Sequence, residues 1–292
     1  MAGWHVGVLG GSGLYELGGL EDVQQIKVAS AFGEPSGPVT MGVLEGVRFT
    51  FLARHGAGHH LSPAAINYRA NIDVLKRCGV TDVLAVCAVG SLREDMAPGD
   101  FAVPDQFIDR TEGRARSFFG EGVTAHVSLA DPVCPRLAGL AAAAAEGAGA
   151  RVHRGGCYVA IEGPQFSTRA ESELYRQWGG STIGMTAMPE VRLAREAELP
   201  YAVLGMVTDY GSWRAVEAAD AASILSVMRE NVGRARTALV ELARSLPEER
   251  EPSGIDRALD NAIMTPPDQW DPPLARRLDA VAAGYFRRRS GG

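Results

Sequence analysis

Four apolar runs along the chain end in small, polar or charged residues. Each is short enough for a buried β-strand, and none approaches the ~18 residues of a membrane-spanning helix. Since the ends of parallel strands meet at one edge of an open sheet, we expect their terminal residues to share one pocket. The four segments are residues 6–13, 51–56, 83–91 and 201–213.

Helical patterns alternate with these strand-like runs. Ile66, Ala70, Ile72 and Leu75 predict an amphipathic helix that ends near Gly79. Further strands are expected over residues 47–53, 101–104 and 157–161, and further helices over residues 137–145 and 191–197. Such an alternation predicts an α/β fold in which βαβ units build an open sheet.

The segment V-T-D-Y-G-S-W, residues 207–213, is the central candidate for chemistry. A buried strand there would deliver Asp209 to a loop, where its carboxylate can meet a ligand. The alternative is that Asp209 only caps the helix that follows.

Several strand ends carry groups that suit an anion. The glycine-rich loop with Ser12 could approach a phosphate through its backbone amides, whereas a dinucleotide fingerprint would need glycine where Glu16 stands. Arg54 offers a guanidinium suited to phosphate, beside His55. Metal binding by the nearby histidines is the lesser option, since no carboxylate or cysteine accompanies them. Thr186 follows another strand-like run and is a further anion candidate.

Other strand ends offer backbone or apolar contacts. Cys87 is expected to be a small core residue rather than a nucleophile. Pro164 breaks a strand, so that Phe166 can face a cavity and stack on a flat ring. The alternative is that Phe166 belongs to the core. Ser167 or Thr168 is expected to cap the next helix.

Two long segments lack a clear periodic pattern. Residues 112–135 form an excursion that is typical of a lid or an interface arm. Residues 249–292 contain several prolines and Trp270, and we expect either an ordered strap over a neighbour or the pocket, or a flexible tail.

Composition narrows the class of protein. The formal net charge of the 292 residues is −6 at pH 7, and the only dense basic run is Arg287–Arg289, so nucleic acid is not an expected partner. The cysteines, at positions 78, 87, 134 and 157, have no C-x-x-C spacing and predict neither zinc nor a disulfide framework. With no apparent leader and no apolar span, we expect a cytoplasmic protein that does not enter the membrane.

The motifs, taken together, resemble those of the purine nucleoside phosphorylase superfamily, most closely its 5′-deoxy-5′-methylthioadenosine phosphorylase branch. The resemblance covers residues 6–245. It rests on G-G-S-G-L, L-A-R-H-G, N-Y-R-A-N, V-G-S-L-R-E, P-D-Q-F-I-D-R-T, I-E-G-P-Q-F-S-T-R-A-E, G-M-T-A-M-P-E and T-D-Y, which occur in the family's order.

The resemblance implies a single α/β domain over residues 1–248 with a central mixed sheet flanked by helices, followed by a C-terminal extension over 249–292. It also implies a homotrimeric pentosyltransferase of purine and methionine salvage. Such an enzyme cleaves an N-glycosidic bond with inorganic phosphate and needs no metal or organic cofactor.

Residue roles follow from the same resemblance. It implies that Asp209 faces the N7 and 6-amino edge of adenine as the catalytic residue and that Met185 contacts the ribose through its backbone. Phe166 and Ser167 would shape the base pocket. The residues that would hold the phosphate are Ser12, Arg54, His55, Cys87, Ala88 through its amide, and Thr186. Around the 5′ substituent would lie Ala221, Ile224 and, from a neighbouring subunit, His126.

Three departures from the family pattern keep alternatives open. Gly211 stands where adenine-specific members carry a second aspartate, Cys87 where a phosphate-contacting threonine is usual, and Gln165 where an arginine is usual. A 6-oxopurine enzyme acting on inosine or methylthioinosine is one alternative, although Asp209 rather than asparagine argues against it. A nucleoside-binding protein without turnover is another, and Arg54, His55 and Thr186 argue against that.

Overall fold

A computed structural model of the chain describes residues 3–11, 13–14, 17–214 and 221–290. Eleven strands of the described part form one mixed sheet, in the order β2-β3-β4-β1-β5-β10-β9-β7, and β11, β6 and β8 branch from β5. The strands are β1 (His5–Gly10), β2 (Glu21–Ile26), β3 (Val39–Leu44), β4 (Val47–Ala53), β5 (Asp82–Ser91), β6 (Phe101–Val103), β7 (Gln106–Arg110), β8 (Val152–Arg154), β9 (Cys157–Ile161), β10 (Gly180–Gly184) and β11 (Tyr201–Asp209).

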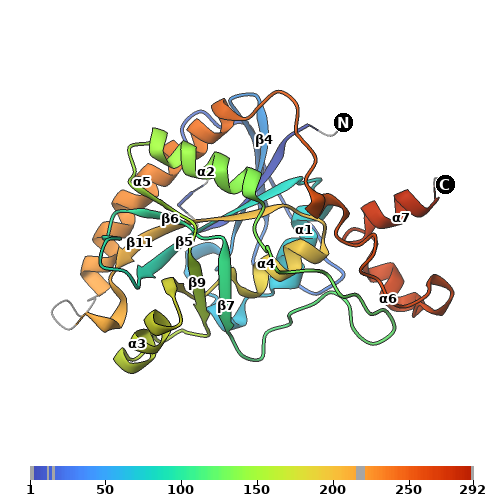
Figure 1. Ribbon diagram of the computed structural model, residues 1–292. Helices are drawn as coiled ribbons and strands as arrows, with labels where there is room; N and C mark the ends of the chain where they lie inside the picture. The colour runs from blue at the N-terminus through green and yellow to red at the C-terminus, as the bar shows by residue number, and fades with distance from the viewer. Residues whose placement is uncertain (1–2, 12, 15–16, 215–220, 291–292) are drawn as a thin grey trace.

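Helices cover both faces of this sheet (Figure 1). They are α1 (Tyr68–Arg77), α2 (Pro135–Gly147), α3 (Arg169–Gln177), α4 (Ala187–Glu196), α5 (Ala221–Ser245), α6 (Pro272–Arg277) and α7 (Ala283–Ser290). No helix of the described residues is both long and apolar enough to cross a bilayer. The predicted α/β fold with a central mixed sheet is confirmed.

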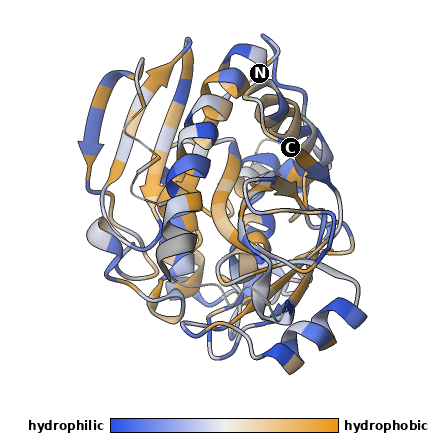
Figure 2. Cartoon of the chain, turned by 90° about the vertical axis from the view of Figure 1, so that its left-hand side faces the viewer, coloured by the Kyte–Doolittle hydropathy of each residue, from blue (hydrophilic) through white to orange (hydrophobic). Residues whose placement is uncertain are grey.

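The strands are apolar on both faces because each face has its own helical layer. Alternate residues of β5 illustrate this: Leu84 and Val86 pack with α2 and α5, whereas Val83 and Ala85 pack with α1 and α4. In Figure 2 the central strands are accordingly rich in orange apolar residues, while the helices carry both orange and blue.

The parallel strands bring the predicted chemistry to one edge. β5 pairs in parallel with β1 on one side and with β11 on the other, and β1 pairs in parallel with β4. The residues after β1, β4 and β11 therefore emerge at the same edge as the end of β5. Near that edge β5 also pairs antiparallel with β10, which adds the β10–α4 connection to the group.

Three helix starts differ from the predicted bounds, one of them that of α2, which begins at Pro135 rather than at residue 137. The helix predicted from Ile66 begins at Tyr68, since the Asn67 side chain accepts a hydrogen bond from the Ala70 amide and caps it there. The helix predicted over 191–197 begins at Ala187, directly after Thr186. Thr168, rather than Ser167, caps α3, in a reciprocal capping box with Glu171.

The excursion over residues 112–134 is held by the C-terminal segment. The His126 amide donates to the Ala262 carbonyl (2.8 Å), and the Met264 amide donates to the Thr124 carbonyl (2.8 Å). No regular helix or strand lies within this excursion, which we call the arm.

The C-terminal segment itself packs on the chain's own core. Leu278, Val281 and Ala282 are fully buried, and the Trp270 ring contacts the rings of Tyr285 and Phe286. These residues of the extension therefore belong to the chain's own hydrophobic core. The division of the chain at residue 248 and contact with a neighbour stay predictions.

Candidate active site

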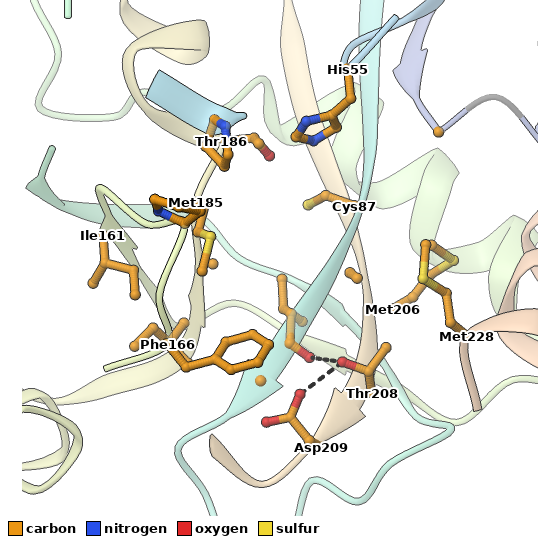
Figure 3. A pocket seen from close by; sticks show the side chains of 18 of the residues that line it. His55, Cys87, Ile161, Phe166, Met185, Thr186, Met206, Thr208, Asp209 and Met228 are labelled. Carbon is orange, nitrogen blue, oxygen red and sulfur yellow. Dashed lines mark hydrogen bonds between the residues drawn. The ribbon is translucent and has the colours of Figure 1, made fainter. Parts of the chain in front are cut away.

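A cavity of about 920 Å³ lies at the sheet edge where these strands end. Figure 3 shows His55 and Thr186 at one end of it and Phe166 and Asp209 at the other, with Cys87 and Met185 between them. Its described lining includes most of the predicted site residues, namely Arg54, His55, Cys87, Ala88, Phe166, Ser167, Met185, Thr186, Asp209 and Gly211. Four separate strand ends thus form one pocket, as the sequence predicted.

Four predicted residues are not placed in this cavity by the described structure. Ser12 lies outside the described residues, and so do the side chains of Ala221 and Ile224. His126 belongs to the arm, is exposed, and is not among the residues that line its own chain's cavity. Its predicted place in a neighbour's cavity stays a prediction.

Arg54 reaches the cavity from the end of β4 and is almost completely buried. Its Nε donates to Oε1 of Glu190 (2.5 Å) and its Nη2 to Oε2 (3.0 Å), while Nη1 and Nη2 also donate to the carbonyls of Val86 and Leu9. Burial alone would lower the pKa of Arg54, but the Glu190 carboxylate outweighs it and raises that pKa. The guanidinium is thus a fixed positive charge.

Glu190 is a functional residue that the sequence analysis missed. It is fully buried on α4, where it joins Arg54 to Tyr201, whose hydroxyl donates to Oε2 (2.9 Å). An isolated buried carboxylate would be costly, so this pairing explains how both charges can lie in the interior. Nothing local in the sequence indicates a partner 136 positions from Arg54.

His55 presents one ring nitrogen to the cavity. Its Nδ1 lies 2.8 Å from the Leu61 carbonyl, and because a carbonyl only accepts, this nitrogen carries the proton. The His59 ring stacks on it at 4.0 Å. Burial, the charge of Arg54 and the neighbouring His59 lower the pKa of His55 to about 4, so the ring is neutral at pH 7. Nε2 is then an acceptor for a protonated oxygen.

Thr186 and Cys87 complete this end of the cavity. Thr186 precedes the first residue of α4, and its hydroxyl makes no capping hydrogen bond to that helix. The described part of the chain therefore leaves the hydroxyl for a group in the cavity. Cys87 is buried, and burial raises the pKa of its thiol to about 11, which makes it a poor nucleophile, in line with the expectation from sequence.

Met185 and Phe166 form the walls between the two ends. A side-chain carbon on Gly163 would lie 2.5 Å from the Met185 sulfur, so glycine is required for Met185 to pack over the start of the β9–α3 connection. Phe166, on that connection, is 66% exposed although it lines the cavity, and it is not a core residue. Ser167 donates to, or accepts from, the Ser172 hydroxyl (2.7 Å).

Asp209 ends β11 at the opposite end of the cavity. Its Oδ1 accepts from the Gly211 amide (2.6 Å) and its Oδ2 from the Thr208 hydroxyl (2.8 Å). The carboxylate is half-buried, so its remaining lone pairs can meet a ligand. Tyr210, rather than Asp209, is the N-cap residue of the following 3₁₀-helix Gly211–Trp213, although the Asp209 carboxylate accepts from the amide of that helix's first residue.

A further apolar surface of the cavity was not predicted from sequence. It joins residues near β1, on β11 and on α5, namely Leu14, Met206, Met228 and Val232. Methionine at such positions is more often packing than ligand contact, and periodicity cannot separate the two. Only the fold shows that these residues meet at the pocket.

Sequence comparison decides the family. The sequence model of the family described as "Phosphorylase superfamily" matches residues 5–244. The chain belongs to the phosphorylase superfamily. It is therefore an enzyme of the pentosyltransferase type, as its motifs predicted.

Individual relatives of this phosphorylase are similar over nearly their full length. A protein of Cereibacter sphaeroides named S-methyl-5′-thioadenosine phosphorylase is 54% identical over 97% of this chain and 98% of its own. One of the same name from Bradyrhizobium diazoefficiens is 51% identical over 97% and 98%.

Solved structures agree with this placement. A methylthioadenosine phosphorylase sourced from an antarctic soil metagenomic library superposes with a TM-score of 0.92 at 41% identity, covering 95% of this chain and 98% of its own. Methylthioadenosine phosphorylase from Schistosoma mansoni in complex with adenine gives a TM-score of 0.77 at 37% identity, covering 82% and 91%.

Proposed function

We propose that this phosphorylase cleaves S-methyl-5′-thioadenosine with inorganic phosphate, giving adenine and 5-methylthioribose 1-phosphate. The names of its full-length relatives support this substrate. The observation that carries the proposal is the arrangement of the cavity, in which a cationic, hydroxyl-bearing end with Arg54 and Thr186 lies opposite a carboxylate end with Asp209.

That arrangement matches the charges of the reaction. As the bond between C1′ and N9 breaks, the sugar becomes positive and the purine negative. The phosphate oxygen that attacks C1′ forms the new bond, and its negative charge stabilises the sugar. Arg54, His55, Thr186, Ser12 and the amide of Ala88 would hold this phosphate. Cys87 then lies beside the phosphate without supplying a hydroxyl.

Asp209 would complete the reaction at the purine. As a general acid it would give a proton to N7 as the electron pair of the broken bond moves onto the ring, which then leaves as neutral adenine, and Asp209 would regain a proton from water before the next turnover. The Gly211 amide and the Thr208 hydroxyl fix the orientation of the carboxyl group, so that no rotation is needed at that moment. Phe166 and Ser167 would shape the base pocket, and Met185 would contact the ribose.

The apolar wall supports a preference for an apolar group at the 5′ position. Met206 and Met228 would face the methylthio group, together with Ala221 and Ile224 and the His126 side chain of a neighbouring subunit. A 5′-hydroxyl in the same place would lose its partners in water, at a cost of about 1–3 kcal/mol. Methylthioadenosine is therefore favoured over adenosine.

We also propose the setting in which the enzyme works. Inorganic phosphate is the co-substrate, and neither a metal nor an organic cofactor takes part. The active unit is a homotrimer with its sites near the subunit interfaces, located in the cytoplasm and serving purine and methionine salvage. Gel filtration with light scattering tests the trimer, and activity in the presence of a chelator tests the independence from metal.

One observation favours a second substrate class. Gly211 provides no side chain beside Asp209, so a second carboxylate that would select the 6-amino group is missing. A 6-oxopurine nucleoside, inosine or methylthioinosine, is the alternative substrate on this ground. A site kept for nucleoside binding without turnover is the remaining alternative.

A product assay separates these possibilities. Purified protein is incubated with methylthioadenosine, adenosine, inosine or methylthioinosine, with and without phosphate, and the released base is measured by chromatography. Phosphate-dependent release of adenine, fastest from methylthioadenosine, is expected. Faster release of hypoxanthine would assign the enzyme to the oxopurine class, and binding without any release would mean that turnover has been lost.

A further inference from the structure

Arg114 is a buried arginine of the arm that lies behind the active site. Its side chain is 2% exposed, and it does not line the cavity formed by the described residues. A buried guanidinium needs partners for its five N–H groups, and those partners show what the residue holds in place.

The partners of Arg114 are backbone groups of the two connections that line the cavity. Nη1 donates to the carbonyls of Met185 (2.7 Å) and Met188 (2.8 Å), which flank Thr186. Nη2 donates to the carbonyl of Glu162 (2.7 Å), where the β9–α3 connection begins. One planar group therefore ties the β10–α4 connection to the β9–α3 connection.

A third part of the cavity is attached through Tyr68. Nη1 of Arg114 also donates to the Tyr68 hydroxyl (3.0 Å), which itself donates to the carbonyl of Pro63 (2.9 Å). Pro63 lines the cavity, in the loop that follows His55. The same guanidinium thus also reaches the segment that carries this histidine.

The Glu162 carboxylate keeps the guanidinium in this position. Its Oε2 lies 2.9 Å from Nε of Arg114 and accepts from the Glu112 amide (2.8 Å). Lysine could supply the charge but not a flat fork whose donors point at several acceptors at once. The number and direction of the hydrogen bonds therefore call for arginine.

We propose that Arg114 is a positioning residue for the phosphate subsite, which it shapes through the backbone of residues 185–188 without touching a substrate. The inference rests on the proposed function. Thr186 lies within the segment whose ends Arg114 fixes, whereas Asp209 belongs to β11, to which Arg114 donates no hydrogen bond among the described contacts. Phe166 and Ser167 of the base pocket are attached to the fork only through the Glu162 carbonyl at the start of their connection, whereas both ends of the segment that carries Thr186 are fixed. Loss of the fork should thus affect phosphate more than the base.

The test compares phosphate with adenine in Arg114→Lys. The KM for phosphate is measured at saturating methylthioadenosine, and the Kd values for phosphate and for adenine are measured by calorimetry. We expect the phosphate KM and Kd to rise about tenfold to a hundredfold, since displacements of about 1 Å can have effects of that size. The adenine Kd should change by less than about threefold. A merely structural role would weaken both ligands alike or neither.

Arg116→Lys is the matched control, because Arg116 lies in the same arm, pairs with Asp109 and contacts no cavity segment through its described hydrogen bonds. It should leave both ligands unaffected. An unchanged phosphate KM in Arg114→Lys, an equal shift in Arg116→Lys, or a parallel loss of adenine binding would each overturn the inference.

A second variant covers the case in which Arg114→Lys does not fold. Glu162→Gln keeps the carbonyl acceptor and the arginine but removes the ionic anchor, at a side chain that is 28% exposed. It should raise the phosphate KM and Kd several-fold and leave adenine binding unchanged. No selective effect on phosphate would refute the inference. If wild-type protein does not turn over methylthioadenosine, the proposed function fails, while the phosphate Kd still tests the role of Arg114.

Discussion

The Glu190 carboxylate holds the Arg54 guanidinium in a bidentate ion pair, with 2.5 Å between Nε and Oε1 and 3.0 Å between Nη2 and Oε2, and both side chains are buried. Arg54 follows β4 and Glu190 lies on α4, so the pair connects two elements that meet only in the folded chain. It places a permanent positive charge at the phosphate end of the cavity. The free-energy cost of burying the charged guanidinium depends on its pairing with Glu190.

Replacing Glu190 with glutamine should destabilise the fold markedly. Arg54 would keep its charge in the interior without a counter-charge, and breaking one partner of a buried pair costs about 3–5 kcal/mol. Urea denaturation of the purified variant measures this loss.

Glu196→Gln is a control on the same helix. Burial raises the pKa of Glu196 to about 7, and its hydrogen-bond partners are the neutral Ser117 hydroxyl and Phe118 amide. It should cost about 1 kcal/mol. Equal losses in the two variants would contradict the role of the ion pair.

Asp209→Asn should change the choice of base. Asparagine cannot give a proton to N7, so kcat/KM for methylthioadenosine should fall about 10²–10⁴-fold, the range of general acid catalysis. An amide can donate to the oxygen of hypoxanthine, so the loss for methylthioinosine should be smaller. Chromatography of the released bases measures both rates. An unchanged ratio of adenine to hypoxanthine would disprove the assigned role of Asp209.

Gly211→Asp should strengthen the preference for adenine. Gly211 has φ of 63°, a conformation that aspartate adopts more readily than most residues, and an added side-chain carbon would meet its neighbours at 3.5 Å or more. A second carboxylate beside Asp209 can accept from the 6-amino group and would repel an oxygen there. We expect the ratio of kcat/KM for methylthioadenosine over methylthioinosine to rise about tenfold or more.

Gly211→Ala is the control for this substitution. It places a side chain at the same positive φ, with a backbone strain of about 1 kcal/mol or more, and adds no carboxylate. The ratio of the two substrates should stay near that of the wild type. A similar rise in the alanine variant would assign the effect to the backbone rather than to recognition of the amino group.

The strand ends could be predicted from sequence because each depends on a local pattern. The apolar run at 201–207 identifies the strand that ends at Asp209, and the spacing of Thr168 and Glu171 identifies the capping box. Parallel pairing then brings Arg54, Cys87 and Asp209 to one edge. These features needed no knowledge of contacts between distant residues.

The groups that hold the site could not be found in this way. Arg114 lies in an arm without periodicity, and its acceptors are backbone carbonyls, which every residue has. Glu190 stands in a helix as glutamate commonly does, and only folding brings Arg54 to it. Met206 and Met228 have the pattern of core residues, so their place at the cavity depends on packing.

Acid should destabilise the protein through its buried histidines, and His5 provides a measurable case. His5 is 1% exposed, with Nε2 2.8 Å from the Thr50 hydroxyl. Burial, together with the charge of Arg48, lowers the pKa of His5 from 6.5 to about 4. At pH values between these two pKa values, His5 is protonated in the unfolded chain but not in the folded chain. The stabilisation is therefore complete above pH 6.5 and is lost as the pH falls toward 4.

The size of this effect follows from the two pKa values, and a glutamine variant isolates it from the acid sensitivity of other groups. Each pH unit in the window contributes up to about 1.4 kcal/mol, so one histidine contributes at most about 3 kcal/mol. Between pH 7.5 and pH 4.5 the free energy of unfolding should fall by about 2 kcal/mol less in His5→Gln than in the wild type. The glutamine side chain keeps a hydrogen-bond donor for the Thr50 hydroxyl. Urea denaturation at the two pH values provides the measurement.

His60→Gln, at an exposed position, is the control and should show the same fall in the free energy of unfolding as the wild type. If the free energy of unfolding of His5→Gln falls as much as that of the wild type, His5 titrates alike in the folded and unfolded chains.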